Sequence, residues 1–263
     1  MSSIAKQPFS KALAEAIERC YQAFGDYPVP SELDVCTQCC MAPEMEAQMR
    51  KWPLRDIPAE YFHVYNSSAK ADVQRADEVG YFLPRMLELI AQGEELHYST
   101  EMYLVRLERC PKGGFTPLQW QAVQAAAEAV FAEALSRYPW QPYIHEPLFV
   151  LFDVLLMWHK GGLDIQPMLD FWQRSDTPSA TLQYADSAWF GYWVKGGIDE
   201  PFAEDQPQYI SLMEAWLKDE NHQSTFLARL LALDVQAVPG VEDWWCGGDF
   251  IPELLDAMRQ GMS

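Results

Sequence analysis

The sequence predicts an all-α fold, an irregular stack of helical hairpins of the HEAT-like kind in one compact domain over residues 1–263. Apolar residues recur at three- and four-residue spacing in several segments, which is the period of an amphipathic helix. Several of these segments start at a proline, whose missing N–H costs nothing in the first helical turn. No segment alternates apolar and polar residues over six positions, and no Asn-Gly or Asp-Gly hairpin turn is present, so strands are not expected.

The first helix is expected from Ser10 to Phe24, with Gly25 as its C-terminal stop. Its apolar face is formed by Leu13, Ile17, Cys20, Tyr21 and Phe24. The segment 25–30 is rich in residues that break helices and is expected to be a connector. Three short helices are expected next, each with a proline in its first turn, at Pro43–Lys51, Pro58–Ala69 and Pro84–Gln92.

The segment Tyr81-Phe82-Leu83-Pro84-Arg85 marks the start expected for the third of these helices. Arg85 and Glu88 lie one helical turn apart, so their side chains can form an ion pair. We interpret this segment as an anchored helix start. The alternative is that Arg85 clamps a carboxylate or phosphate group, because a guanidinium matches the geometry of both.

Two longer helices are expected in the second half of the chain. Thr116 and Gln119 form a capping box at the start of the helix Pro117–Arg137, which continues as an alanine-rich run of high helix propensity. The helix Pro147–His159 is apolar nearly all round, which is typical of a helix central to a core. Asp153 is then expected to be a buried or half-buried carboxylate that needs a partner.

Three helix junctions share the pattern Lys-Gly-Gly, an apolar residue and a capping residue. They are Lys112–Thr116, Lys160–Asp164 and Lys195–Asp199, and Cys246–Asp249 is a looser relative. Lysine suits a last helical turn, glycine permits a left-handed exit, and Thr or Asp caps the following helix. The pattern favours helical hairpins, and a coincidence of favourable turn chemistry is the alternative.

The charge of the chain is acidic and uneven. The net charge is −19, of which residues 1–112 carry −5 (12 Lys and Arg, 17 Asp and Glu) and residues 113–263 carry −14 (7 and 21). A subdivision near residues 111–116, into an N-terminal part and an acidic, Trp-rich part, is therefore the alternative to a single domain. Binding to nucleic acid or to an anionic membrane surface needs clustered Lys and Arg, so neither is expected.

A cytoplasmic location is expected for this chain. The first residues lack the apolar segment of a secretory signal, and no apolar run approaches the ~18 residues of a membrane span. Eight of the ten tryptophans lie between Trp140 and Trp245. We interpret most of them as core residues, and the alternative is a groove that recognises a partner.

The cluster Cys36-Thr37-Gln38-Cys39-Cys40 holds half of the six cysteines. The Cys-x-x-Cys spacing suits two zinc ligands, and Cys40 adds a third thiolate. The chain has no second Cys-x-x-Cys pair, so His63, Cys20 or Cys110 would have to supply a fourth ligand through the fold. Further alternatives are a redox pair and a reactive thiol near the start of the next helix. We favour small apolar side chains packed at a helix junction, with no metal ligand assigned.

No other motif assigns a catalytic residue or a cofactor. The chain lacks a His-x-x-x-His pair, a Gly-x-Ser-x-Gly elbow, a P-loop and a dinucleotide-binding glycine motif. Asp153 with His145 or His159 is the remaining alternative for acid–base chemistry. The adjacent carboxylates Asp199/Glu200 and Glu204/Asp205 are interpreted as surface charge.

Three runs together resemble an uncharacterised family of bacterial cytoplasmic proteins. They are Asp34–Met41 with the pattern CxxCC, Pro53-Leu54-Arg55-Asp56-Ile57-Pro58, and Tyr81-Phe82-Leu83-Pro84-Arg85. The resemblance covers roughly residues 30–110 and implies a bacterial source. It implies no activity, no cofactor and no site residues.

These observations favour a non-enzymatic cytoplasmic protein that acts by protein–protein contact. Its acidic C-terminal half would meet a basic partner, and one form of this is a protein that masks a cationic toxin or nuclease, because opposite charge speeds encounter. The alternative is a zinc-binding protein organised by Cys36, Cys39 and Cys40. No oligomeric state is predicted.

Overall fold

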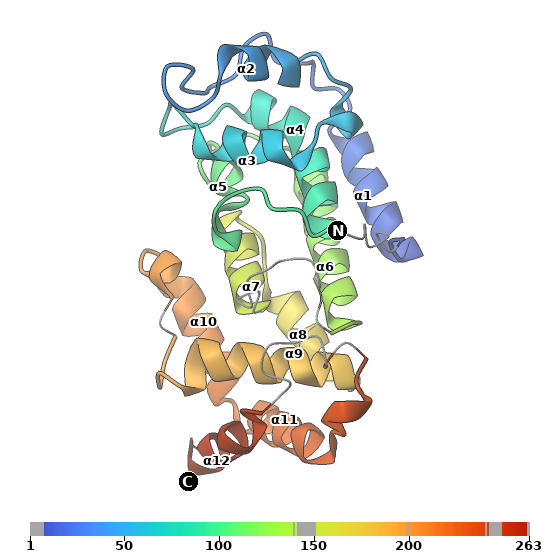
Figure 1. Ribbon diagram of the computed structural model, residues 1–263, viewed down its shortest axis with the longest axis vertical. Helices are drawn as coiled ribbons and strands as arrows, with labels where there is room; N and C mark the ends of the chain where they lie inside the picture. The colour runs from blue at the N-terminus through green and yellow to red at the C-terminus, as the bar shows by residue number, and fades with distance from the viewer. Residues whose placement is uncertain are drawn as a thin grey trace. The chain divides into compact units, whose positions relative to one another are not determined.

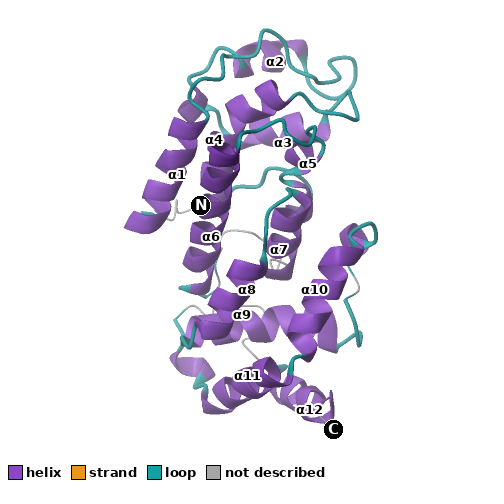
Figure 2. Cartoon of the chain, turned by 180° about the vertical axis from the view of Figure 1, so that it is seen from behind, coloured by secondary structure: helices purple, strands orange, loops and turns teal. Residues whose placement is uncertain are grey.

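The computed structural model is all-α, as predicted (Figure 1). It describes residues 8–138, 140, 151–198, 200–239, 241 and 249–261. Within these ranges the backbone forms helices and loops without a strand, and an isolated bridge pairs Val35 with Ala69 (Figure 2). None of the described helices is long and apolar enough to span a membrane. The HEAT-like stacking remains a prediction.

The helices follow one another with short connections. In chain order they are α1 (Lys11–Ala23), α2 (Pro43–Met49), α3 (Ala59–Ser67), α4 (Ala76–Ala91), α5 (Val105–Glu108), α6 (Pro117–Leu135), α7 (Leu151–Lys160), α8 (Gln166–Arg174), α9 (Pro178–Ala188), α10 (Pro207–Lys218), α11 (Glu220–Ala232) and α12 (Ile251–Gly261). A π-helical turn, η3 (Trp189–Trp193), follows α9, and short 3-10 turns lie at η1 (Leu54–Asp56), η2 (Thr100–Met102), η4 (Pro201–Ala203) and η5 (Val235–Ala237).

The chain divides into two compact units. Unit 1 holds residues 1–130 and 160–163, and unit 2 holds residues 131–159 and 164–263. The division passes through α6 between Val130 and Phe131. It therefore lies further along the chain than residues 111–116, where the charge distribution suggested a subdivision. Each unit has its own buried core.

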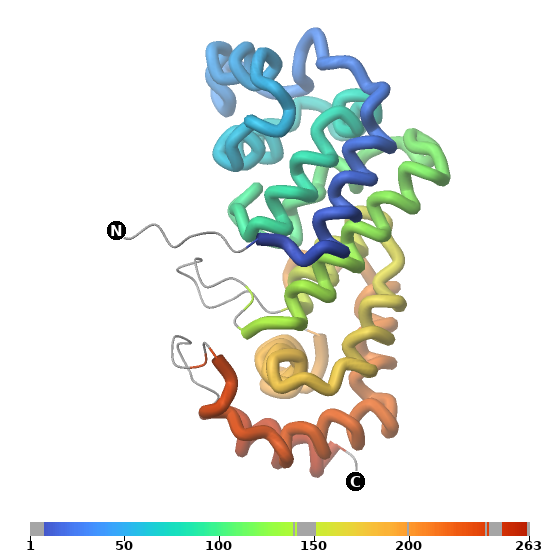
Figure 3. The backbone as a smooth tube through the Cα atoms, turned by 90° about the vertical axis from the view of Figure 1, so that its right-hand side faces the viewer, coloured from blue at the N-terminus to red at the C-terminus, as the bar shows by residue number. Residues whose placement is uncertain are grey.

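Unit 1 is organised around α4, which contacts α1, α3, α5 and η1. Figure 3 shows α1 (dark blue) beside α4 (teal). The first helix is confirmed, because Ser10 caps α1 and its side chain accepts a hydrogen bond from the Leu13 N–H at 3.3 Å. Gly25 follows the end of α1 as expected. Its φ is not positive, however, so the helix does not end in a left-handed glycine there.

The expected helix start at Pro84 is wrong. α4 begins at Ala76, and Pro84 lies inside it. The acidic residues Asp77 and Glu78 lie in the first turn of α4, where they complement the positive end of the helix dipole. Proline in a helix interior removes one hydrogen bond and crowds the carbonyl four residues earlier, which belongs to Gly80. Sequence reasoning favoured the first-turn position of proline, and the tertiary packing of α4 overrides that preference.

The glycine junctions and the capping box behave as predicted. Each Lys-Gly-Gly junction in the described residues contains one glycine with positive φ: Gly113 (85°), Gly162 (85°) and Gly196 (73°). At the start of α6 the Thr116 N–H donates to Gln119 Oε1 at 2.9 Å, and the Gln119 N–H donates to Thr116 Oγ1 at 3.3 Å. Asp199 and most of the segment 246–249 lie outside the described residues.

Unit 2 is organised around α9, in which every residue from Ala180 to Ala188 is buried. The predicted aromatic core is confirmed for Trp140, Trp158, Trp172 and Trp216, which are buried. Trp189 and Trp193 are only half-buried, and Trp244 and Trp245 lie outside the described residues. α7 is confirmed as a core helix: Leu151, Phe152 and the residues from Val154 to Trp158 are buried, while residues 147–150 of the expected helix are not described.

Candidate metal and thiol site at the cysteine cluster

The cysteine cluster, defined as Cys36, Cys39 and Cys40, lies on a turn of unit 1 between Val35 and α2. Its first residue is fixed to the neighbouring segment, because the Cys36 N–H donates to the Ser68 carbonyl at 2.8 Å. The Cys36 carbonyl accepts from the Cys40 N–H at 3.3 Å and from the Met41 N–H at 3.0 Å. The turn is therefore held at both of its ends by main-chain bonds.

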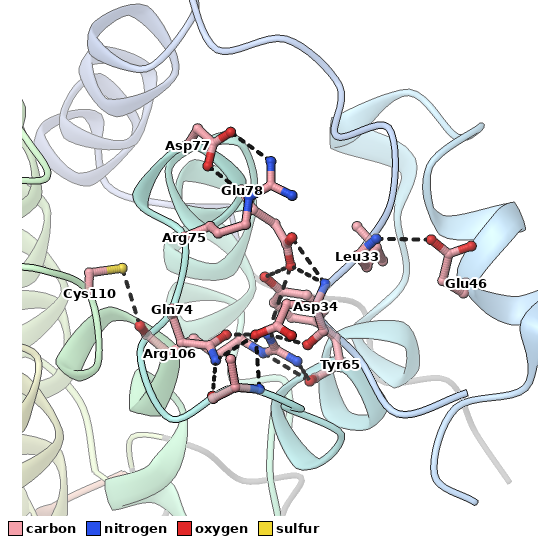
Figure 4. Close-up of polar contacts among 11 residues, drawn as sticks. Leu33, Asp34, Glu46, Tyr65, Gln74, Arg75, Asp77, Glu78, Arg106 and Cys110 are labelled. Atoms are coloured by element: carbon pink, nitrogen blue, oxygen red, sulfur yellow. Dashed lines mark hydrogen bonds and ion pairs between the residues drawn. The ribbon is translucent and has the colours of Figure 1, made fainter. Parts of the chain in front are cut away.

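A buried polar network fixes Asp34, which lies two residues before Cys36 (Figure 4). The Asp34 N–H donates to both carboxylate oxygens of Glu78 at 3.1 Å, and Tyr65 Oη donates to Glu78 Oε1 at 2.9 Å. The Asp34 side chain accepts from the Ala71 N–H at 3.2 Å and from Gln74 Nε2 at 3.0 Å. These bonds connect the base of the cysteine turn to α3, to α4 and to the loop between them.

Arg106, on α5, supplies the positive charge of this network. The guanidinium is fully buried, and its Nη1 lies 3.8 Å from Glu78 Oε1. It donates to the Tyr65 carbonyl from Nε at 3.0 Å and to the Asp34 carbonyl from Nη1 at 3.1 Å, and it also donates to Gln74 Oε1. Its Cζ stacks 3.6 Å from the centre of the Tyr65 ring. Arg106 thus binds three segments at once.

Burial is the largest influence on the pKa of the Glu78 carboxyl group. Removal of water raises the pKa of its carboxyl group, and the Asp34 N–H, the Tyr65 hydroxyl and the Arg106 charge oppose that rise. A buried carboxylate with three such partners is a structural group, because each partner offsets part of its desolvation. Sequence reasoning missed this network. The available signal was Arg106 itself, a charged residue inside the apolar run from Leu104 to Leu107.

The three thiols of the cluster lie within contact of one another. Cys39 Sγ is 3.3 Å from Cys36 Sγ and 3.2 Å from Cys40 Sγ, and all three sulfur atoms lie within 4.8 Å of one another. Cys36 is half-buried, and Cys39 and Cys40 are exposed. The favoured sequence interpretation, thiols packed as small apolar side chains, is therefore wrong for Cys39 and Cys40, because both face solvent.

The cluster separates its thiols by acidity. The pKa of Cys36 is lowered to about 7, because its thiolate accepts a hydrogen bond from the Cys39 thiol and from the backbone N–H groups of Gln38 and Cys39. The pKa of Cys39 is raised to about 12 by its bonds to Cys40 and Cys36 and by their negative charge. The coupled thiols of Cys36 and Cys39 therefore lose a first proton near neutral pH, and the charge that results opposes loss of the second.

None of the expected fourth ligands joins the cluster among the described residues. Cys20 is fully buried, and its thiol donates to the Ala122 carbonyl at 3.2 Å. Cys110 donates to the Arg106 carbonyl at 3.3 Å. Burial raises the pKa of both thiols to about 12, which disfavours the thiolate form that binds metal. The Nε2 atom of His63 instead lies 3.4 Å from Glu95 Oε1.

The chain was compared with protein-family models, with curated proteins and with solved structures, and none of them matches. The geometry of the cluster therefore carries the evidence for function. It presents three exposed or half-exposed thiols, one of them acidic, on a turn with a fixed base. Such a group can bind a thiophilic metal ion or undergo thiol chemistry.

Arg85, the next candidate from the sequence, is held in place by contacts within unit 1. Arg85 lies within α4, where its Nη1 is 2.7 Å from Glu88 Oε2 and its Nε donates to the Ile57 carbonyl at 3.1 Å. Tyr21 Oη donates to the same Glu88 oxygen at 2.6 Å. The expected Arg85–Glu88 ion pair is confirmed, whereas the interpretation as a helix start is wrong because Pro84 and Arg85 lie inside α4.

The acid–base alternative at Asp153 stays a prediction. Asp153 is half-buried on α7, as predicted, and the ring of His159 packs against Tyr209 with centroids 5.6 Å apart. His145 lies outside the described residues. Glu204 and Asp205 are exposed, which confirms their interpretation as surface charge.

Proposed function

We propose that this protein binds a thiophilic metal ion, with zinc as the first candidate, through Cys36, Cys39 and Cys40. The observation that carries the proposal is the convergence of three sulfur atoms within 4.8 Å on an exposed turn. Thiolates are the ligands that zinc and copper(I) prefer in proteins. The lowered pKa of Cys36, about 7, makes a substantial fraction of this thiol a thiolate at neutral pH, and the thiolate is the form that binds metal.

The spacing of the sulfur atoms fits a metal ion after a small movement. Tetrahedral zinc with Zn–S bonds of about 2.3 Å places its sulfur ligands about 3.8 Å apart. The two shortest Sγ separations in the cluster are 3.3 and 3.2 Å, so each sulfur needs to move outward by only a few tenths of an ångström. Cys39 and Cys40 are exposed and can make that movement by rotation of the side chain.

The proposed site has three protein ligands among the described residues. A structural zinc site is usually closed by a fourth protein ligand, whereas three ligands leave one position for water, a small ligand or a residue of another molecule. Exposure of Cys39 and Cys40 makes that position accessible. The arrangement therefore supports a site that exchanges its metal ion or presents it to a partner.

A titration of reduced, metal-free protein with Co²⁺ tests the proposal. We expect one equivalent to produce the sulfur-to-cobalt charge-transfer absorption of a thiolate site, and Zn²⁺ to displace the cobalt. The variants C36S, C39S and C40S should each lose the absorption or weaken the binding. C110S is the matched control and should bind as the wild type does, because Cys110 donates to the Arg106 carbonyl. A titration without the thiolate absorption would remove the proposal.

A second candidate function is the capture of a basic protein, favoured by the surface of unit 2. Its described residues include ten exposed acids and four exposed bases. The acids are Asp164, Asp170, Asp176, Glu204, Asp205, Glu220, Asp234, Asp249, Glu253 and Asp256, and the bases are Arg174, Lys195, Lys218 and Arg259. Opposite charge on a partner would speed encounter and fix orientation.

Co-purification from the native host at low and moderate salt tests this second candidate. A cationic partner held by surface charge should be recovered at low salt and released as salt rises, because screening shortens the Debye length to about 8 Å at physiological ionic strength. The variant E204Q/D205N removes two adjacent exposed charges and should reduce recovery. Recovery of no cationic protein under either condition would count against the candidate.

A further inference from the structure

The cysteine cluster contains one pair of thiols that is positioned to form a disulfide. Cys36 Sγ and Cys39 Sγ lie 3.3 Å apart, and the two residues are separated by Thr37 and Gln38. A disulfide bond is about 2.05 Å long, so closure requires the two sulfur atoms to approach by roughly 1.2 Å. Cys39 lies on the exposed part of the turn, where its side chain can rotate toward Cys36.

The neighbouring pair, Cys39 and Cys40, is disfavoured by its backbone although its sulfur atoms are 3.2 Å apart. The Cα atoms of adjacent residues are about 3.8 Å apart across a trans peptide. Disulfides span Cα separations of about 4.4–6.8 Å, so adjacent cysteines are too close for an unstrained bridge. The Cα separation therefore distinguishes the Cys36–Cys39 pair from the Cys39–Cys40 pair, although their sulfur–sulfur distances are nearly equal.

We propose that Cys36 and Cys39 form a reversible disulfide by exchange with a low-molecular-weight disulfide, and that this oxidation switches off metal binding at the cluster. The part concerning metal rests on the proposed function, because the same thiols are used. The disulfide removes two of the three thiolates and leaves Cys40 alone, and a single thiolate does not make a metal site. Conversely, a bound metal ion would occupy the sulfur lone pairs and protect the pair.

The chemistry balances as two exchange steps. The thiolate of one member of the pair attacks the disulfide RSSR, which forms a mixed disulfide and releases RS⁻. The second member loses its proton, and its thiolate attacks the protein-side sulfur of the mixed disulfide, which forms the Cys36–Cys39 bond and releases a second RS⁻. The protein loses two protons and two electrons, and RSSR gains them and is reduced to two thiols. A thiol in excess reverses both steps.

The fixed base of the turn allows this change to stay local. Main-chain bonds hold Cys36 to Ser68 and to residues 40–41, and the Arg106–Glu78 network fixes Asp34. Closure of a Cys-x-x-Cys ring requires movement of the side chains and of residues 37–39, which are exposed. We therefore expect the helices of unit 1 to keep their structure in the oxidised protein.

The test uses full-length, reduced and metal-free protein incubated with oxidised glutathione. Remaining thiols are alkylated, and cleavage after Glu32 and Glu44 isolates the three clustered cysteines from Cys20 and Cys110 for mass spectrometry. We expect the peptide 33–44 to lose two hydrogen atoms and to carry the alkyl group on Cys40. Alkylation of Cys39 or Cys36 in place of Cys40, or a peptide alkylated at all three sites, would overturn the proposal.

Single variants provide the matched comparison. C36S and C39S lack the second exchange step and should accumulate the glutathione mixed disulfide, whereas C40S should still form the bridge. C110S should behave as the wild type does. Circular dichroism of each variant establishes that it is folded. Equal products from C39S and C40S would overturn the assignment of the pair.

Metal titration of the oxidised protein separates this inference from the function on which it rests. If the reduced protein binds no metal, the proposed function fails, while peptide mapping still decides the disulfide. If the bridge forms and the oxidised protein binds Co²⁺ with unchanged affinity, the switch fails and the metal site stands. We expect binding to fall by at least tenfold on oxidation and to return after reduction.

Discussion

Replacing Arg106 with methionine should destabilise the protein by about 3–5 kcal/mol, the usual cost of removing one partner of a buried ion pair. The guanidinium is fully buried, and its Nη1 lies 3.8 Å from the Glu78 carboxylate. It donates to the carbonyls of Tyr65 and Asp34 at 3.0 and 3.1 Å. Methionine is flexible and can fill much of the space, but it donates no hydrogen bond.

The magnitude follows from the groups that the substitution leaves behind. The Tyr65 and Asp34 carbonyl oxygens each lose a hydrogen bond from a charged donor, which contributes about 1.5–3 kcal/mol, and keep a weaker one from the Ser68 and Lys70 N–H groups at 3.3 and 3.4 Å. Glu78 loses its positive neighbour but keeps the Asp34 N–H and the Tyr65 hydroxyl, at 3.1 and 2.9 Å. These two remaining bonds keep Glu78 from becoming an isolated buried charge. The expected loss of unfolding free energy in R106M therefore stays at about 3–5 kcal/mol.

Urea unfolding followed by circular dichroism measures the effect, with R75M as the matched control. Arg75 also pairs with an acid of α4, since its Nη2 lies 2.8 Å from Asp77 Oδ2, but both side chains are about half exposed. Exposed pairs contribute about 0–1 kcal/mol because water screens them. The reasoning is refuted if R106M costs no more free energy of unfolding than R75M does.

The pH dependence gives a second check on the same residue. In the folded protein the pKa of Glu78 is raised above its ordinary value by burial, and the Arg106 charge lowers it in part. R106M should raise that pKa further. A raised folded pKa favours the protonated, folded form below the unfolded pKa, and this stability is lost as pH rises through the folded pKa. The cost of R106M should therefore be greatest above the folded pKa of Glu78 in the variant and should shrink as the pH falls through that pKa toward the ordinary value of 4.5.

Three further predictions concern other parts of unit 1. Alkylation of Cys36 by iodoacetamide should rise with pH around a midpoint of about 7, whereas Cys110, whose pKa is about 12, should react slowly throughout, as peptide mass spectrometry can follow. G80A should cost roughly 1–3 kcal/mol in urea unfolding, because its Cβ would lie 2.8 Å from a ring atom of Tyr27. T116A should cost about 1 kcal/mol in the same assay, because it removes the side-chain cap of α6.

The cysteine cluster shows how far the sequence leads toward the candidate site. The Cys-x-x-Cys-Cys spacing by itself places three thiols near one another, because a five-residue segment that turns cannot separate them widely. Whether those thiols face the core or the solvent depends on the packing of residues remote in sequence. Cys36 is held by Ser68, which lies 32 residues further along the chain, so the exposure of the cluster was not predictable from the local pattern.

Helix boundaries divide in the same way between local and tertiary causes. The start of α6 was predictable, because Thr116 and Gln119 satisfy each other's backbone N–H groups within four residues. The start of α4 was not, because Pro84 signals a first turn and lies instead in the helix interior. Burial of α4 against α1 and α3 compensates for the hydrogen bond that the proline removes.

The sequence by itself determined the all-α fold, the glycine-bearing helix junctions, the capping box and the grouping of three thiols. Each of these depends on residues only a few positions apart, and hydrogen bonding and backbone sterics act over that range. The tertiary structure alone decided that Arg106, Glu78, Tyr65 and Asp34 share one buried network and that Cys39 and Cys40 face solvent. Burial and charge pairing depend on which distant segments meet, and that information is not carried by any local pattern.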